Sequence, residues 1–367
     1  MTIAEAARLK TEIMRDAKDK ALAKVHRRAK AAGPAFLHAT TNGRYLPVPR
    51  DFWTSGFWPG LMNLALNEGE DSTCRAAAIE AEDGLFDILQ TDEFFGLHHD
   101  VGFQFMPTSV MRFRQTGNPD ARRRGLIAAH ILAGRFNVNS QAIEAWNGAA
   151  RSGYSIIDTV MNLPLLFWAT NELNEPRFAN MAKLHLETVV REFIRDDFTT
   201  HHIVQFDSNT GARIAAHGGQ GHAPESAWSR GQAWAIYGLA IAARYTGDGR
   251  YTALSRKIAN SFLELNAPHG VPPWDFSVDD VQNAPRDSSA SAIAACGLLE
   301  LGDLGDPKAE CEAVSLITTL TQRVACFDDS EDGILKEATS ALPHGTHVSD
   351  SLIYGDYYYV EALLRLT

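Results

Sequence analysis

Six segments of the chain share an unusual composition, and their recurrence constrains the fold more than any other feature. Each segment begins with polar or aromatic residues and continues with small and apolar residues that carry few charges. The six segments begin at Trp53, His99, Ser152, Trp228, Asp287 and Tyr354. Because helices that are apolar on every side are buried, we expect these segments to form an inner layer of helices.

Charged stretches with one apolar stripe and one polar face lie between these segments and predict amphipathic helices at the rim of the fold. Clear examples are residues 5–31, 75–89, 177–195 and 251–265. Six alternations of the two kinds indicate a closed repeat, with an inner ring of six helices inside an outer ring of six. The sequence therefore predicts one all-α catalytic domain over residues 1–367, an (α/α)6 barrel. Residues 201–207 and 271–276 are expected to be short strands or extended loops.

Composition argues against several classes of function. The chain holds 34 Lys and Arg against 45 Asp and Glu, a net charge of −11 without a dense basic stretch, which disfavours nucleic acid as a partner. No apolar run approaches the roughly 18 residues of a membrane span, and the N-terminal stretch lacks the apolar core of a signal peptide, so we expect a cytoplasmic protein. The four cysteines have no CxxC spacing and no accompanying His pair, so neither a zinc site nor a disulfide framework is expected.

Aromatic and acidic residues cluster at the N-terminal ends of the inner segments. They are therefore expected to converge at one mouth of the barrel, where helix N-termini favour anions. Long loops at residues 136–151, 198–226 and 271–286 precede inner helices and would wall the same mouth. Loops of this kind on a rigid scaffold commonly carry function, so we expect the ligand site there.

Two aspartates are the strongest catalytic candidates. Asp100 begins the second inner segment, where it could also serve as a helix N-cap, and Asp158 lies one turn deeper in the third. An ionised carboxylate inside an apolar helix is costly unless it is paired or used. If the two face each other across a pocket, repulsion raises the pKa of at least one of them. Such a pair suits general acid/base work, as in glycoside hydrolysis.

Aromatic residues near the same mouth favour a carbohydrate ligand, because sugar rings stack on flat aromatic faces. The candidates are Trp53, Trp58, Trp146, Trp228 and Trp234, although some of these tryptophans are expected to be core residues. Core packing is expected above all for Trp58 and for Trp168, which lies deeper in the third segment.

Polar side chains at the mouth supply further candidates. The planar guanidinium of Arg230 suits a carboxylate or sulfate, with an ion pair to a neighbour such as Glu225 as the alternative. Asp287 and Asp356 are expected to be N-caps. Donors at the rim are His99, His202, Gln220 and His222.

Six strings of the sequence resemble, in the same order, those of the unsaturated glucuronyl hydrolases of glycoside hydrolase family 88. They are DFWTSGFWPG, HHDVGFQF, SIIDTVMNLPLLFWA, WSRGQAWAIYGLA, RDSSASAIAACGLLEL and YGDYYYVEALLRL. The resemblance implies an (α/α)6 barrel without metal or organic cofactor. It also implies a hydrolase that hydrates the vinyl ether of an unsaturated uronic acid, at the non-reducing end of oligosaccharides released by polysaccharide lyases.

The same resemblance assigns residue roles. Asp158 matches the general acid/base and Asp100 the second carboxylate. The positions implied to bind substrate are His99, Trp53, Trp146, His202, Gln220, Trp228, Arg230 and Trp234. His201 is an alternative to its neighbour His202, because the flanking loop aligns only loosely.

Three other functions stay open: a sugar isomerase or epimerase that uses a His pair, a non-catalytic uronate-binding protein, and an unsaturated rhamnogalacturonyl hydrolase. The string Gln232-Ala233-Trp234 favours the glucuronyl group over the last of these. The expected partner is a small acidic oligosaccharide derived from chondroitin, hyaluronan, heparin, gellan or another polymer. Sulfate tolerance would depend on loop contacts that include residues 336–349. The protein is expected to be a monomer or a weak homo-oligomer.

Overall fold

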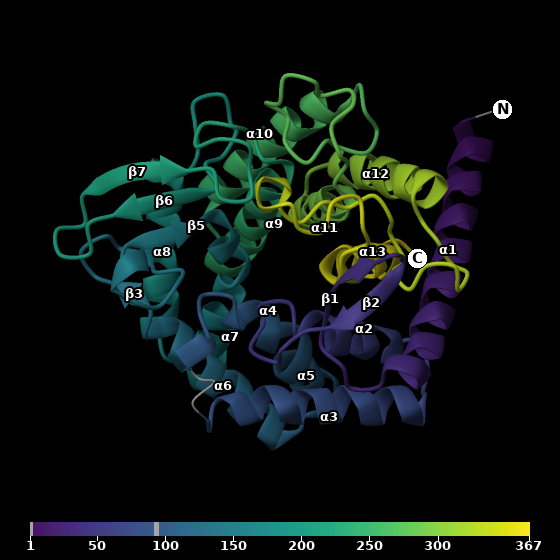
Figure 1. The fold of residues 1–367 in the computed structure, drawn as a ribbon, viewed down its shortest axis with the longest axis horizontal. Coiled ribbons are helices and arrows are strands. Elements are labelled where there is room, and N and C mark those ends of the chain that lie inside the picture. Colours follow the sequence, from purple (N-terminus) through teal and green to yellow (C-terminus); the bar gives the residue numbers. More distant parts are fainter. Residues whose placement is uncertain (1–2, 92–94) are drawn as a thin grey trace.

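The computed structural model describes residues 3–91 and 95–367, with side chains from residue 11 onward. Helices form two concentric layers around a central axis in this part of the chain (Figure 1). The inner layer comprises α2 (Phe57–Leu66), α4 (Val101–Phe105) with α5 (Met111–Thr116), α7 (Leu163–Leu173), α9 (Ser229–Thr246), α11 (Ser288–Asp303) and α13 (Ile353–Leu366). The outer layer comprises α1 (Ile3–Ala32), α3 (Ser72–Ile88), α6 (Pro119–Ala133), α8 (Arg177–Glu192), α10 (Gly249–Asn266) and α12 (Ala309–Arg323).

Burial of the helices follows the predicted division into two layers. In the inner helix α9 every residue from Ser229 to Ala243 is buried, including Arg230. In the outer helix α8 one stripe, with Phe178, Leu186 and Val189, is buried, and the opposite face is polar. The (α/α)6 barrel predicted from the sequence is thus confirmed. None of the helices in the described part of the chain is both long and apolar enough to cross a membrane.

The two ends of the chain meet and close the ring. Helix α1 packs against α13, α12, α2 and α3, and Figure 1 shows it beside the C-terminal end. Its buried Lys24 donates hydrogen bonds from Nζ to the carbonyl oxygens of Cys326 (2.8 Å) and Gly333 (2.7 Å). The long-range contacts of α1 therefore join the beginning of the chain to its last turns.

Short strands lie in the loops between the helices. Strands β1 (Leu37–Thr41) and β2 (Arg44–Pro47) form one antiparallel pair, and β3 (Phe136–Asn137) and β4 (Ala142–Ile143) form another. A three-stranded antiparallel sheet has the order β5 (Tyr154–Ile156), β6 (Ile203–Phe206), β7 (Arg213–His217). Strand β6 confirms the extended segment expected at 201–207, whereas residues 271–276 make only isolated bridges. Single 3₁₀ turns occur at η3 (Ala149–Arg151) and η5 (Leu342–His344).

The third inner segment differs from its prediction. It was expected to be helical from Ser152, but it runs as strand β5, then as the 3₁₀ segment η4 (Ile157–Met161), and becomes α-helical only at Leu163. Residues 154–156, which end with the β-branched Ile156, pair with β6, and Pro164 favours a helix that begins next to it. Asp158 therefore lies in a 3₁₀ turn at the entrance to α7, and its placement inside an α-helix was wrong.

The second inner segment is also interrupted. Between α4 and α5 the chain forms one π-helical turn, η2 (Met106–Val110). Pro107 has no N–H to donate to the helical ladder, and the wider turn accommodates it.

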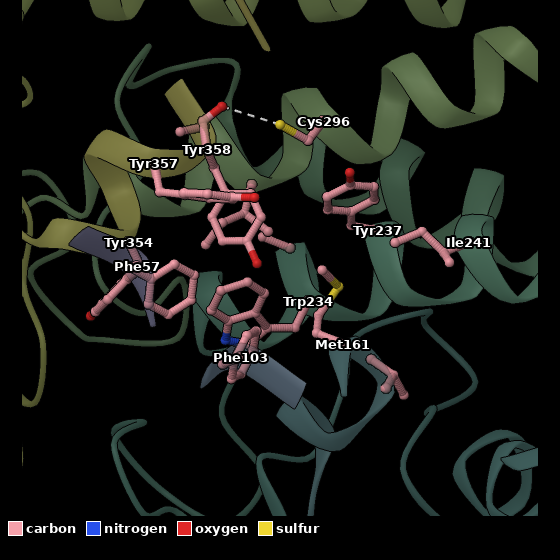
Figure 2. Packing of buried hydrophobic residues seen from close by; sticks show 14 of the residues in the cluster. Phe57, Phe103, Met161, Trp234, Tyr237, Ile241, Cys296, Tyr354, Tyr357 and Tyr358 are labelled. Carbon is pink, nitrogen blue, oxygen red and sulfur yellow. Dashed lines mark hydrogen bonds between the residues drawn. The ribbon is translucent and has the colours of Figure 1, made fainter. Parts of the chain in front are cut away.

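An aromatic layer fills the middle of the barrel, where residues from several inner helices point toward one another (Figure 2). Ring centroids are 5.4 Å apart for Phe57 and Phe103, 5.1 Å for Phe103 and Trp234, and 5.5 Å for Trp234 and Tyr358. Phe57, Phe103 and Tyr358 line a cavity of about 290 Å³ on one side of this layer. Trp53, which packs on Phe57 and Phe103, lines a different cavity. The closely packed aromatic layer thus separates these two cavities.

Candidate active site

A cavity of about 370 Å³ lies at the N-terminal ends of the inner helices, at the mouth that the sequence indicated. It contains both predicted carboxylates, Asp100 and Asp158. It also contains most of the predicted binding residues, namely His99, Trp53, Trp146, His202 and Gln220. The structure therefore brings together side chains from three inner segments and from the loops that precede the third and fourth segments.

Asp100 is held by two histidines. It occupies the N-cap position of α4, but its side chain makes no capping hydrogen bond. Its Oδ2 atom lies 2.8 Å from Nδ1 of His98 and 3.4 Å from Nε2 of His99. Burial raises the pKa of Asp100, but His99, the hydrogen bond from His98 and the more distant Arg135 outweigh burial, so the pKa lies below its ordinary value. Asp100 is thus the ionised member of the pair.

Asp158 has the opposite environment. Its side chain is nearly buried, and its Oδ2 atom accepts no hydrogen bond from any described residue. Burial raises its pKa to about 7, the negative charge of Asp100 adds to the increase, and Arg230 opposes it. Near neutral pH a substantial fraction of Asp158 is therefore protonated. Two carboxyl groups whose environments separate their pKa values are typical of an acid and a charged partner at one site.

The pocket histidines are fixed in orientation. Nδ1 of His99 lies 2.9 Å from the hydroxyl of Thr159, which neighbours the catalytic candidate. Nδ1 of His202 lies 2.9 Å from the carbonyl oxygen of Gly218, and Nε2 lies 3.7 Å from Oδ2 of Asp158. Burial lowers the pKa of His99 to about 4 and that of His202 to about 3. Both imidazoles are therefore neutral at physiological pH.

One group of side chains has the composition of a cation site. Ligand atoms of His98, His99 and Asp100 lie within 4.8 Å of one another. In this structure both imidazoles approach the same oxygen of Asp100, so they serve as partners of the carboxylate.

Arg230, for which a substrate-binding role is expected, lies behind the cavity and does not belong to its lining. Its guanidinium, 1% exposed, forms an ion pair with Asp287, which also caps α11, and the pairing with Glu225 that was considered as the alternative does not form. It also donates to the carbonyl oxygens of Thr339 (2.8 Å) and Ser340 (2.6 Å). A further hydrogen bond goes to Oε1 of Gln220, at 2.6 Å. Arg230 therefore positions Gln220 and the loop around Ser340, both of which line the cavity.

Two of the predicted tryptophans also support the cavity from behind. Trp228 and Trp234 are 1% and 0% exposed. The ring of Trp228 packs on His202, with centroids 4.2 Å apart, and Trp234 belongs to the aromatic layer of Figure 2. A sugar stacked in the cavity would meet Trp53 and Trp146 instead. Trp58 and Trp168 are core residues, as expected.

The cavity lining and the hydrogen bonds show where three further candidates lie. His202, and not His201, faces the cavity, because His201 packs beside Pro224 and Arg195. His222 stays outside the cavity lining. Asp356 is not the N-cap that was expected: it lies in the first turn of α13 and accepts hydrogen bonds from the backbone N–H groups of Ile334 and Leu335.

Sequence reasoning did not assign several residues of the cavity. They are His38, Phe52, His98, Ile156, Ile203, Gly219, Ser340, Ala341, His344, Thr346 and His347. His98 adjoins the predicted pair in the string HHDVG, and residues 336–349 were noted only as a loop that could contact sulfate. His38 lies in β1, far from any recognised string, and no local pattern marks it.

Comparisons with known proteins agree with this geometry. The family model for Glycosyl Hydrolase Family 88 matches residues 30–365. The chain is 34% identical over 352 residues to the unsaturated glucuronyl hydrolase of Bacillus sp. (strain GL1), with 93% of each chain covered. It is 33% identical over 342 residues to the unsaturated chondroitin disaccharide hydrolase of Streptococcus pyogenes serotype M1, with 89% of this chain and 84% of the relative covered.

Solved structures show the same likeness. The crystal structure of the Bacillus sp. GL1 unsaturated glucuronyl hydrolase superimposes with a TM-score of 0.91 at 33% identity, covering 96% of both chains. An unsaturated glucuronyl hydrolase specific for heparin gives a TM-score of 0.89 at 29% identity, covering 97% of both chains. Because the family model spans nearly the whole chain and the barrel places two unlike carboxyl groups in one cavity, this chain belongs to glycoside hydrolase family 88.

Proposed function

We propose that this glycoside hydrolase removes the unsaturated uronic acid from the non-reducing end of lyase-generated oligosaccharides, by hydrating the vinyl ether of that sugar. The observation that carries the proposal is the carboxyl group of Asp158, which is buried, has a pKa of about 7 and belongs to the lining of a sugar-sized cavity. The names of the relatives, which include unsaturated glucuronyl and unsaturated chondroitin disaccharide hydrolases, support the same substrate class.

The proposed reaction begins with proton transfer. Asp158, in its protonated form, donates its proton to carbon four of the unsaturated ring, and positive charge develops at carbon five and the ring oxygen. A water molecule adds to carbon five and returns a proton to Asp158. The resulting hemiketal opens by breaking the bond between carbon five and the ring oxygen, which leaves a ketone at carbon five and a hemiacetal at carbon one. Collapse of this hemiacetal to an aldehyde breaks the glycosidic bond and releases the shortened saccharide and a keto acid.

Asp100 has a supporting role in this scheme. Because it stays ionised, its charge stabilises the positive charge that develops on the ring, and it also keeps the pKa of Asp158 high. His98 and His99 orient this carboxylate. Trp53 and Trp146 offer aromatic faces in the cavity wall for the sugar rings.

The environment of the histidines bears on the isomerase alternative. An acid/base pair of imidazoles needs one member that is protonated near neutral pH. His99 and His202 have pKa values of about 4 and about 3, so neither is a good acid there. The buried carboxyl of Asp158 fits that role better.

The decisive experiment compares Asp158→Asn with the unchanged protein on a panel of unsaturated disaccharides from chondroitin, hyaluronan, heparin and gellan. Hydration removes the conjugated double bond, so ultraviolet absorbance of the uronate decays. We expect turnover to fall at least about 100-fold while circular dichroism stays unchanged, given the usual worth of a general acid/base. Asp279→Asn, on an exposed loop away from the cavity, is the matched control and should leave turnover intact.

Two results would contradict the proposal. Near-full activity of Asp158→Asn would remove this residue from the chemistry. No decay on any disaccharide, with the protein folded, would favour a binding protein or an isomerase on the same barrel.

Location and assembly remain predictions. The four cysteines are free, and three of them are buried, which suits a reducing compartment such as the cytoplasm. Analytical ultracentrifugation directly tests the prediction that the protein is a monomer or a weak homo-oligomer.

A further inference from the structure

A second cavity lies on the other side of the aromatic layer from the two aspartates. Its volume is about 290 Å³, near the lower limit of about 300 Å³ for small-molecule sites. Met161, Tyr237 and Ile241 belong to its lining and lie to the right of Trp234 in Figure 2. None of its lining residues lines the catalytic cavity, so the reaction proposed above leaves this cavity without a role.

The interior of this second cavity is apolar and aromatic. Phe57 and Phe103 line it with rings that belong to the aromatic layer. Three methionines, Met106, Met111 and Met161, line it as well. Methionine side chains are flexible and polarisable, and they pack favourably against aromatic rings. A flat aromatic ring is therefore well suited to this interior.

Two tyrosines of α13 bring polar groups into the same interior. Tyr357 and Tyr358 line the cavity and are only 6% and 4% exposed. A third lining tyrosine, Tyr237, donates its hydroxyl proton to Glu361, whereas the hydroxyl groups of Tyr357 and Tyr358 have no hydrogen-bond partner among the described residues. A buried hydroxyl without a partner costs free energy, and a polar group of a ligand can supply that partner.

Cationic side chains lie at the outer end of the cavity. Arg114 and Arg244 both line it and are exposed. Arg244 forms an ion pair with Glu300. Arg114 donates a hydrogen bond to the hydroxyl of Tyr245 (3.2 Å), and no carboxylate in the described part of the chain pairs with it. Burial raises the pKa of the lining residue Glu361, which disfavours its charged form, so the outer end favours an anionic group.

We infer that this cavity is a second binding site, separate from the catalytic one, for a small aromatic carboxylate that carries a hydroxyl group on its ring. The ring lies among the methionine and phenylalanine side chains of the interior. Its hydroxyl group pairs with Tyr357 or Tyr358, and its carboxylate binds the guanidinium of Arg114. Each polar group of the ligand thus meets a side chain that lacks a matching partner in the described residues.

Isothermal titration calorimetry of the whole protein with 4-hydroxybenzoate tests this inference. We expect one saturable site, and benzoate should bind roughly 3- to 10-fold more weakly, because it lacks the ring hydroxyl. The double replacement of Tyr357→Phe with Tyr358→Phe should abolish this difference. It should not weaken the fold, since it removes two hydroxyl groups for which the described residues offer no partner.

Arg114→Met tests the contact with the carboxylate. We expect it to weaken 4-hydroxybenzoate binding by at least about 10-fold, because a charge-assisted hydrogen bond is lost. Arg114 is exposed, so the fold should be unaffected, and circular dichroism checks this. Arg123→Met is the matched control: Arg123 is an exposed arginine of α6 outside the lining, and its replacement should leave the affinity unchanged.

A competition experiment separates the two cavities. An unsaturated chondroitin disaccharide should not displace 4-hydroxybenzoate, because the disaccharide belongs in the catalytic cavity. Displacement would overturn the inference, and so would the absence of saturable binding at millimolar concentrations. Binding that Arg114→Met leaves unchanged, or equal affinities for the two acids, would also contradict it. None of these measurements depends on turnover, so a failure of the proposed function is distinguishable from a failure of this inference.

Discussion

At the scale of single residues, the site depends on two aspartates with the same chemistry and different surroundings. Asp100 contacts two imidazoles, and its pKa is lowered. Asp158 lies in an apolar turn with one oxygen unpaired, and its pKa is raised to about 7. Burial acts on both carboxyl groups, so the difference between them comes from their neighbours.

The pKa of Asp158 predicts the pH dependence of the reaction. Its protonated form is the acid, so kcat/KM should decline as pH rises through about 7.

In Asp100→Asn the neighbouring negative charge is absent, which lowers the pKa of Asp158. The alkaline limb should then move to lower pH, and the plateau should fall by more than about 10-fold. The measurement is a pH–rate profile of both proteins on one disaccharide. An alkaline limb that stays in place would mean that the two carboxyl groups do not interact.

At the scale of structural elements, the site depends on side chains that tie loops to helix ends. Arg230, at the start of α9, joins the N-cap of α11 to Gln220 and to the backbone near Ser340. The sheet formed by β5, β6 and β7 sets Asp158 opposite His202, since Ile156 pairs with Ile203. These links place loops of very different sequence position around one cavity.

Arg230→Met should destabilise the fold by about 3–5 kcal/mol, because it leaves the buried carboxylate of Asp287 without its partner. We also expect kcat to fall and KM to rise, since Gln220 and the loop at Ser340 lose an anchor. Urea unfolding and steady-state kinetics measure both effects. Replacing Asp287 with Asn in the same protein should recover part of the stability.

Arg250→Met, which removes surface ion pairs with Glu187 and Asp248, is the matched control and should change stability little. If Arg230→Met keeps full stability and only raises KM, the guanidinium binds the substrate carboxylate directly, as the resemblance implied.

At the scale of the whole molecule, the barrel is closed by contacts between its first and last elements. Helix α1 packs on α12 and α13, and its Lys24 reaches the backbone of the segment between them. We propose on this basis that residues 1–367 form a single catalytic domain.

A single domain predicts one cooperative unfolding transition. Far-ultraviolet circular dichroism, which reports helices, and tryptophan fluorescence, which reports the aromatic layer, should give the same urea midpoint. Lys24→Met should shift both midpoints together, because it weakens closure of the whole ring. Two separated transitions, or a shift in one probe alone, would indicate independently folding parts.

The sequence by itself was enough to predict the two rings of helices and the place of Asp100 and Asp158 at one mouth of the barrel. Hydrophobic composition and periodicity are local properties, and they decide whether a helix is buried on all sides or on one. The two aspartates could be singled out for the same reason, since both signals are local: Asp100 lies in a distinctive string, and Asp158 is a carboxylate in an apolar segment, where burial is costly. The 3₁₀ turn that holds Asp158 was missed, because strand pairing between Ile156 and Ile203 overrides the helical pattern.

Only the tertiary structure decided which side chains enter the cavity and which support it. Arg230 pairs with Asp287, which lies 57 positions away, and not with its near neighbour Glu225. His38, near the start of the chain, and His347, near its end, meet with ring centroids 5.1 Å apart. Such contacts depend on closure of the ring, which brings distant segments together. No local sequence pattern predicts these contacts. The ionisation of the two carboxyl groups and the shape of the sugar-binding cavity depend on them and are therefore properties of the assembled barrel.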